Sequence, residues 1–298
     1  MYLITGAGGG VGSVSRQVVK ILLDAGESVR AMVRRDDDRA QQLRTLGAEV
    51  VIGDLTRAGD IATAISGVRR MFFNMSVSSD YLLATTEVAA VAREVGRLDV
   101  IVNMSQMTVS QMTLTSTGES KHQRLHWLAE HVLNWSSLPV IHVRPTVFLE
   151  NPLFAVLGAQ SVRNRNVLAL PFGTGHTSPI ATADVAAVVA ALLRDPADRI
   201  GAVYELTGPE VLDVGGLAEQ FANALKRPIS AEDLAYDEVG RILASAGLPE
   251  HVQQHIATMA RLHREDRYNR ATDDVERILG RAAQTVAQYV ASKPDLFD

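Results

Sequence analysis

A cluster of glycines near the amino end has the composition and spacing of a diphosphate-binding turn. Gly6, Gly9 and Gly12 recur at every third position, after the apolar run Tyr2-Leu3-Ile4 and before apolar residues at helical spacing. Glycine lets the backbone approach a pyrophosphate, and the free N–H groups at a helix start face the anion. In this strand–turn–helix context we expect a dinucleotide pyrophosphate to contact Gly6, Gly8, Gly9, Gly10, Val11 and Gly12.

Two arginines, Arg34 and Arg35, follow the next predicted strand at residues 28–33. An enzyme that prefers NAD(H) usually carries an acidic residue here, which bonds the ribose hydroxyls. A guanidinium suits a 2′-phosphate instead, so we expect NADP(H) to be preferred over NAD(H). The alternative is that Arg34 and Arg35 are a pair of solvated loop residues with no ligand. Asp36, Asp37 and Asp38 are expected to cap the following helix.

Residues after four further predicted strands could contact the cofactor, although each group could also be an ordinary turn. The strands are predicted at 48–52, 71–73, 98–102 and 139–143. In chain order, the candidate contacts after them are Asp54 and Leu55; Asn74, Met75 and Ser76; Met104 and Ser105; and Pro145, Thr146 and Val147.

Strands and helices alternate through the first half of the chain, which predicts a parallel sheet with helices on both faces. We therefore expect an α/β fold, a Rossmann-type doubly wound sheet with a smaller, mostly helical C-terminal cap domain. The predicted dinucleotide-binding domain covers residues 1–150, with later returns to the sheet near 182–208. Residues 151–298 form the predicted substrate or cap region.

Composition limits the function classes. The chain has 298 residues, a net charge of −5 and no cysteine, which excludes disulfides and thiolate chemistry. Its acidic balance favours no nucleic-acid partner, and no apolar run reaches membrane-spanning length. With no secretory start visible, we expect a cytoplasmic protein.

The chain resembles the NmrA-like atypical short-chain dehydrogenases, in their quinone-reductase-like branch. The similarity is carried by the glycine spacing, Arg34, Lys121-His122, the run Val143-Arg144-Pro145-Thr146, and Asp184. This resemblance implies a Rossmann domain, a helical carboxyl-terminal domain and NADP(H) binding. Some family members reduce quinones or dyes, whereas others bind the dinucleotide as redox-sensing regulators. Standard short-chain reductases use a Tyr with Lys four residues later as proton donor, and we expect this chain to lack that pair.

Lys121 is the best remaining polar candidate for cofactor or substrate contact. With Leu125, Leu128 and Val132 it lies at i, i+4, i+7 and i+11, the expected sheet-facing stripe of a helix. His122 is either an auxiliary acid or a histidine on the helix surface. His122, His126 and Glu130 have a spacing that resembles a metal site, but no wider ligand set accompanies them, so we expect no metal. Tyr81 either reaches the pocket or packs on a neighbouring helix.

Together these patterns predict an NADPH-dependent reductase that transfers hydride to a quinone-like or other conjugated small molecule. The rival interpretation is a non-catalytic NADP(H) sensor that acts on a regulatory protein partner. A homodimer is compatible with both the reductase and the sensor interpretation.

Overall fold

The computed structural model describes residues 1–9, 13–95 and 97–297. Three predicted pyrophosphate contacts, Gly10, Val11 and Gly12, lie outside these ranges.

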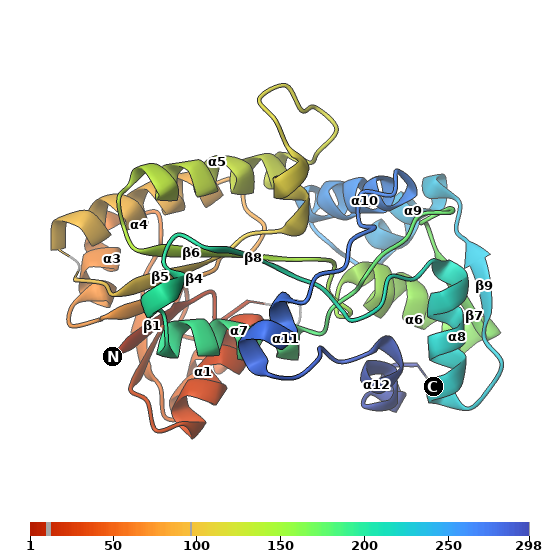
Figure 1. The fold of residues 1–298 in the computed structure, drawn as a ribbon, viewed down its shortest axis with the longest axis horizontal. Helices are drawn as coiled ribbons and strands as arrows, with labels where there is room; N and C mark the ends of the chain where they lie inside the picture. Colours follow the sequence, from red (N-terminus) through yellow and green to blue (C-terminus); the bar gives the residue numbers. More distant parts are fainter. Residues whose placement is uncertain (10–12, 96, 298) are drawn as a thin grey trace. The chain divides into compact units, whose positions relative to one another are not determined.

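A seven-stranded sheet forms the centre of the amino-terminal part of the fold (Figure 1). Its strand order is β3-β2-β1-β4-β5-β6-β8, and the pairs from β3 to β6 are parallel. The strands are β1 (Tyr2–Thr5), β2 (Val29–Val33), β3 (Glu49–Ile52), β4 (Arg70–Phe73), β5 (Val100–Met104), β6 (Val140–Pro145) and β8 (Val203–Leu206). The direction of winding reverses between β1 and β4, which is where such sheets open their ligand crevice. The predicted Rossmann-type fold is confirmed.

Helices cover both faces of this sheet, with α3, α4 and α5 on one side and α1 and α7 on the other (Figure 1). Side chains from α3, α4 and α5 pack with one face of the strands in a single apolar cluster. The helices are α1 (Val14–Asp24), α2 (Asp38–Thr45), α3 (Ala58–Ile65), α4 (Tyr81–Val95), α5 (Lys121–Trp135) and α7 (Thr182–Arg194).

The edge strand β3 departs from the expectation that every strand is covered on both faces. Glu49 and Ile52 are exposed and the two valines between them are half-buried. Because β3 ends the sheet, no further strand shields it on one side.

The carboxyl-terminal part contains a second, two-stranded parallel sheet of β7 (Val167–Leu170) and β9 (Ser230–Asp233). The sequence Ser-Ala-Glu-Asp of β9 is polar and mostly exposed, which is why hydrophobic patterning did not predict a strand there. The helices of this part are a π-helix at Leu153–Gly158, α6 (Ala159–Arg165), α8 (Val214–Leu225), α9 (Tyr236–Ser245), α10 (Glu250–Arg264), α11 (Asp274–Leu279) and α12 (Val286–Ala291). In the described ranges, 3-10 turns are at Met107–Gln111, Ala197–Arg199 and Pro294–Leu296.

The chain divides into two compact units that each draw on separate stretches of sequence. One unit consists of Met1–Val109, Arg124–Arg144 and Val185–Tyr204, and the other of Ser110–Gln123, Pro145–Asp184 and Glu205–Asp298. In the described ranges, none of the helices combines the length and the apolar character needed to cross a bilayer.

Candidate functional site

The glycine turn after β1 packs directly against the end of β4. Gly6 has a φ of +72°, and a Cβ added there would lie 2.7 Å from the carbonyl oxygen of Asn74. The N–H of Gly9 donates to the Gly6 carbonyl at 3.0 Å, which closes a tight turn. A side chain at Gly6 would therefore be strained by its φ and would also collide with the neighbouring backbone.

Polar side chains fix this turn in place. The Thr5 hydroxyl donates to the Asn74 carbonyl at 2.8 Å and accepts from the Asn74 N–H at 2.9 Å. The Asn74 side-chain amide donates to the Ser15 hydroxyl in the first turn of α1 at 2.9 Å. Asn74, a predicted cofactor contact, thus connects β1, β4 and the start of α1.

An ion pair joins the ends of β2 and β3. The Arg34 guanidinium lies 3.1 Å from the Asp54 carboxylate, and the arginine side chain remains 69% exposed. Hydrogen bonds from Thr56, together with Arg34, hold the pKa of Asp54 below its ordinary value. The guanidinium is therefore anchored at the predicted 2′-phosphate position, with most of its surface open to solvent. Arg35 is exposed beside it.

Arg39, which the sequence analysis did not single out, also reaches the glycine turn. Its guanidinium donates to the Gly8 carbonyl at 2.8 Å and to the carboxylate of Asp37. Asp37 caps α2 by accepting the Arg39 N–H, and the hydrogen bonds from Arg39 lower the pKa of Asp37 to about 2. The predicted aspartate cap is present. An arginine in the first turn of the helix after β2 was the signal that could have identified this contact.

At the end of β5 the strand runs further than predicted. Met104 is the last strand residue and does not follow the strand. Its carbonyl accepts a 3.0 Å hydrogen bond from the Tyr81 hydroxyl, and Tyr81 is completely buried against the ring of His126. Burial raises the pKa of Tyr81 well above its ordinary value. Tyr81 therefore packs inside the fold and is not available as a proton donor.

The buried side of α5 combines apolar residues with three polar ones that the sequence did not place there. Lys121 is exposed, whereas His122, His126 and Glu130 are all buried. Leu125 and Val132 of the predicted stripe do pack against the apolar cluster of the sheet, beside the fully buried Ala129 and Leu133. The expectation of a surface position for His122 was wrong, since its ring packs edge-on against His255. The role predicted for Lys121 stays a prediction.

Glu130 belongs to a buried ion pair under α5. Its carboxylate accepts two hydrogen bonds from Arg144, at 2.9 and 2.5 Å. Although burial opposes ionisation, the Arg144 guanidinium lowers the pKa of Glu130 overall. Because Glu130 is committed to Arg144, it is not a metal ligand. Among the residues that the structure describes, no group of His, Asp and Glu could hold a metal ion.

At the end of β6, Pro145 is the last strand residue and Thr146 follows it. The Thr146 N–H donates to the Leu206 carbonyl at 2.9 Å. The Thr146 hydroxyl is buried and has no hydrogen-bond partner in the described part of the chain. Such an orphaned hydroxyl fits a ligand with a polar group. Val147 is core, with 1% exposed.

The other predicted contacts differ in exposure. Leu55 and Met75 pack partly buried against the apolar cluster of the sheet, whereas Ser76 is exposed. Ser105 is buried, and its N–H donates to the Val143 carbonyl at 2.8 Å.

One tyrosine does have a lysine four residues later, so the expectation that the chain lacks this spacing was wrong. Tyr289 and Lys293 lie on and just after α12, with the ammonium 5.4 Å from the ring centroid. Burial and the nearby Glu150 carboxylate raise the pKa of Tyr289. A catalytic tyrosine needs the opposite shift, so this pair supports packing and not proton transfer.

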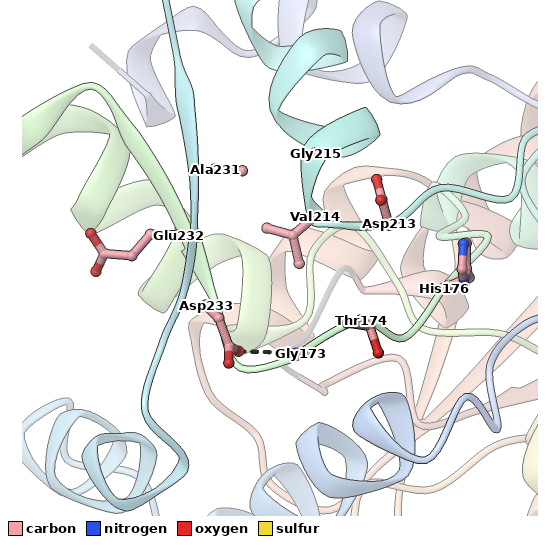
Figure 2. A pocket seen from close by; sticks show the side chains of 9 residues that line it. All are labelled: Gly173, Thr174, His176, Asp213, Val214, Gly215, Ala231, Glu232 and Asp233. Carbon is pink, nitrogen blue, oxygen red and sulfur yellow. Dashed lines mark hydrogen bonds between the residues drawn. The ribbon is translucent and has the colours of Figure 1, made fainter.

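A hollow of ≈ 430 Å³ lies within the second unit (Figure 2). The carboxylates of the aspartate and glutamate residues that line it already have hydrogen-bond or ion-pair partners within the protein. Asp213 caps α8, Glu232 pairs with Arg165, and Asp233 accepts the Gly173 N–H, the bond drawn in Figure 2. None of the predicted contacts lines it. The lining residues are Gly173, Thr174, His176, Asp213, Val214, Gly215, Ala231, Glu232 and Asp233.

The NmrA-like family model matches residues 3–292. The chain belongs to the NmrA-like family. It is 25% identical, over 97% of each chain, to an NAD(P)H azoreductase of Xenophilus azovorans. It shares the fold of the NADPH-dependent quinone oxidoreductase QOR2 from Escherichia coli, crystallised with NADPH, at a TM-score of 0.83 and 21% identity, covering 98% of this chain and 99% of that one. It also shares the fold of NmrA, a negative transcriptional regulator crystallised with NADP. The TM-score is 0.79 at 16% identity, covering 97% of this chain and 94% of that one.

Proposed function

We propose that this protein is an NADPH-dependent reductase that transfers hydride to a conjugated small molecule, such as an azo dye or a quinone. The observation that carries the proposal is the glycine turn held against β4, with Arg34 anchored at the end of the neighbouring strand. The azoreductase relative, aligned along nearly the whole chain, supports the reaction class.

The residues present fit the dinucleotide. Gly6, Gly8 and Gly9, with residues 10–12, would cradle the pyrophosphate, because glycine lets the backbone approach the anion closely. Arg34, assisted by Arg35, would bind the 2′-phosphate. The unpartnered Thr146 hydroxyl would bind a polar group of the nicotinamide half. NADPH, when bound, supplies a hydride from its nicotinamide ring.

The side chains described above favour an acceptor that needs no dedicated acid. The Tyr81 hydroxyl donates a hydrogen bond to a backbone carbonyl in the core, so it is not free to protonate a substrate. The raised pKa of Tyr289 does not suit a catalytic acid either. A quinone or azo group can accept the hydride and then take its proton from water. Lys121 and His122 stay the candidate residues for this chemistry.

The test is NADPH consumption, followed by its near-ultraviolet absorbance, with a panel of small quinones and azo dyes. We expect turnover with at least one acceptor, and loss of most of it in Gly6→Val. Tight NADPH binding without turnover on any acceptor would instead favour a sensor. That second candidate is supported by the fold shared with the NmrA regulator and by the buried tyrosines.

A further inference from the structure

Glu119 is a buried carboxylate of the second unit that the proposed reaction does not use. It directly precedes Ser120 and helix α5 (Figure 1). Its side chain is 4% exposed, and its Oε1 accepts a hydrogen bond from the Arg267 guanidinium at 3.1 Å. Its other oxygen, Oε2, is buried and has no hydrogen-bond partner in the described ranges. A buried acceptor without a donor costs free energy, so Oε2 marks a position that a donor group would fill.

Arg267 holds this carboxylate in a fixed orientation. The Arg267 guanidinium also donates to the side-chain oxygen of Gln111, and the Gln111 amide nitrogen donates back to the Arg267 carbonyl at 2.9 Å. The arginine is thus fixed through both its side chain and its backbone. Oε1 of Glu119 is committed to this arginine, and Oε2 stays available for another group.

The chain that follows Glu119 is fixed as well. The Ser120 N–H donates to the side-chain oxygen of Gln123 at 2.8 Å, and the Ser120 hydroxyl accepts the Gln123 N–H at 3.1 Å. The same hydroxyl lies 2.8 Å from Nδ1 of His255. Because Glu119 is held on both sides, a ligand would meet a preorganised acceptor at Oε2.

Glu119 lies beside the two candidate residues for the proposed chemistry. Lys121 is two residues later in the chain, and the His122 ring packs edge-on against His255, the histidine that Ser120 contacts. Glu119, Lys121 and His122 therefore belong to one local arrangement at the start of α5. A molecule that reacts beside Lys121 and His122 would have Oε2 of Glu119 in its surroundings.

The charge of the Glu119–Arg267 pair limits what can bind there. A carboxylate only accepts hydrogen bonds, so the group at Oε2 must be an O–H or N–H donor. Arg267 already balances the negative charge of Glu119, so a cationic ligand would add a buried charge without a partner. A neutral hydroxyl or amino group satisfies Oε2 without adding charge.

We propose that Glu119 selects acceptors that carry a hydroxyl or amino group on their conjugated system, by accepting a hydrogen bond from that group at Oε2. Arg267 is the positioning residue for this contact. The inference rests on the proposed reductase activity, since it names a chemical feature of the acceptor.

The test compares 4-hydroxyazobenzene with 4-methoxyazobenzene, which differ in having or lacking an O–H donor. We expect kcat/KM with NADPH to favour the hydroxy compound by about 10- to 100-fold, the value of a hydrogen bond to a charged group. In Glu119→Gln the amide oxygen must face the Arg267 guanidinium, which leaves the amide NH₂ at the free position. The preference for the hydroxy compound should then fall to within about 3-fold.

Glu265→Gln is the matched control, because Glu265 also pairs with an arginine of this unit, Arg261, but is half-exposed. Its preference should equal that of the unchanged chain. Calorimetric titration of both azobenzenes into the protein with NADP⁺ repeats the comparison without turnover. Circular dichroism and thermal melting check that each variant folds.

The two measurements separate this inference from the reductase activity. A binding preference that Glu119→Gln removes, without turnover of either compound, would contradict the reductase and support the Glu119 contact. No binding of the hydroxy compound, a preference near one in the unchanged chain, or a preference that survives Glu119→Gln overturns the proposal. Weaker NADPH binding in Glu119→Gln, with the preference kept, would show that Oε2 contacts the cofactor and also overturns it.

Discussion

Arg34 and Asp54 form an ion pair of 3.1 Å that connects the ends of β2 and β3, and the arginine remains the more exposed partner. The pairing orients the Arg34 guanidinium at the end of β2. A ligand phosphate would add a second anion to a side chain that Asp54 already orients, so little rotamer freedom would be lost on binding.

We expect Arg34→Ala to raise the dissociation constant for NADPH by about 10- to 100-fold, the value of charge-assisted hydrogen bonds. NADH, which lacks the 2′-phosphate, should be affected by less than about 3-fold. Calorimetric titration of both nucleotides measures the difference. Arg69→Ala is the control, because Arg69 is also half-exposed and pairs with an aspartate, Asp99, but precedes β4. Equal losses for the two nucleotides in Arg34→Ala contradict the phosphate assignment.

Arg39 should act differently, because its guanidinium holds the Gly8 carbonyl. We expect Arg39→Ala to weaken NADPH and NADH binding by a similar factor, on the order of 3- to 10-fold, as the turn loses one charge-assisted bond. Arg39→Lys should restore little, since one ammonium cannot reach both Asp37 and Gly8 as the forked group does. A loss confined to NADPH would show that Arg39 binds the phosphate and does not position the turn.

Alanine substitutions at Gly6 and Gly26 distinguish the effect of backbone strain from that of steric collision. Both have positive φ, +72° and +77°, but a Cβ at Gly26 meets no atom within 4 Å. Gly26→Ala should therefore cost about 1–2 kcal/mol of unfolding free energy and leave nucleotide binding unchanged. Gly6→Ala should cost more and should weaken binding of both nucleotides at least about 10-fold, because the turn must shift away from Asn74. Urea unfolding and titration measure the two effects, and equal behaviour of the two variants would contradict a close packing of the turn.

Most strands of the seven-stranded sheet could be predicted because their apolar runs are buried, and β2 and β3 were found to within one residue of their observed bounds. The ends of β5 and β6 were predicted too early. Asn103 lies beyond the predicted end of β5, yet it belongs to the strand and its side-chain nitrogen bonds to His142 on β6 at 2.9 Å. Hydrophobic patterning uses only the residue types along the chain, so it does not reveal such hydrogen-bond partners.

The same limit applies to the polar side chains that α5 buries. Leu125 and Val132 pack against the sheet as predicted, but the helix also buries His122, His126 and Glu130. Glu130 is buried because Arg144, fourteen residues later, comes from an adjacent strand. Arg39 was missed for a similar reason, since its link to Gly8 depends on the path of the chain between β2 and α2.

Two buried histidines should make the fold sensitive to mild acid. His263 is sandwiched between the rings of Phe172 and Tyr268, with centroids 4.0 and 3.9 Å away, and His255 is buried beside Ser120. Burial lowers the pKa of His263 to about 3 and that of His255 to about 4. In the unfolded chain a histidine titrates near about 6.5.

Between about pH 6.5 and pH 4 the unfolded chain thus binds more protons than the folded chain. The free energy of unfolding therefore falls as the pH falls. Each histidine contributes a slope of up to about 1.4 kcal/mol per pH unit, and neither contributes above about pH 7.5. His263→Phe keeps a ring in the stack and should remove one such slope from urea unfolding measured at pH 7, 6 and 5. His251→Phe, at an exposed position of α10, is the control and should leave the slope in place. An unchanged slope in His263→Phe would mean that this histidine accepts its proton in the folded state.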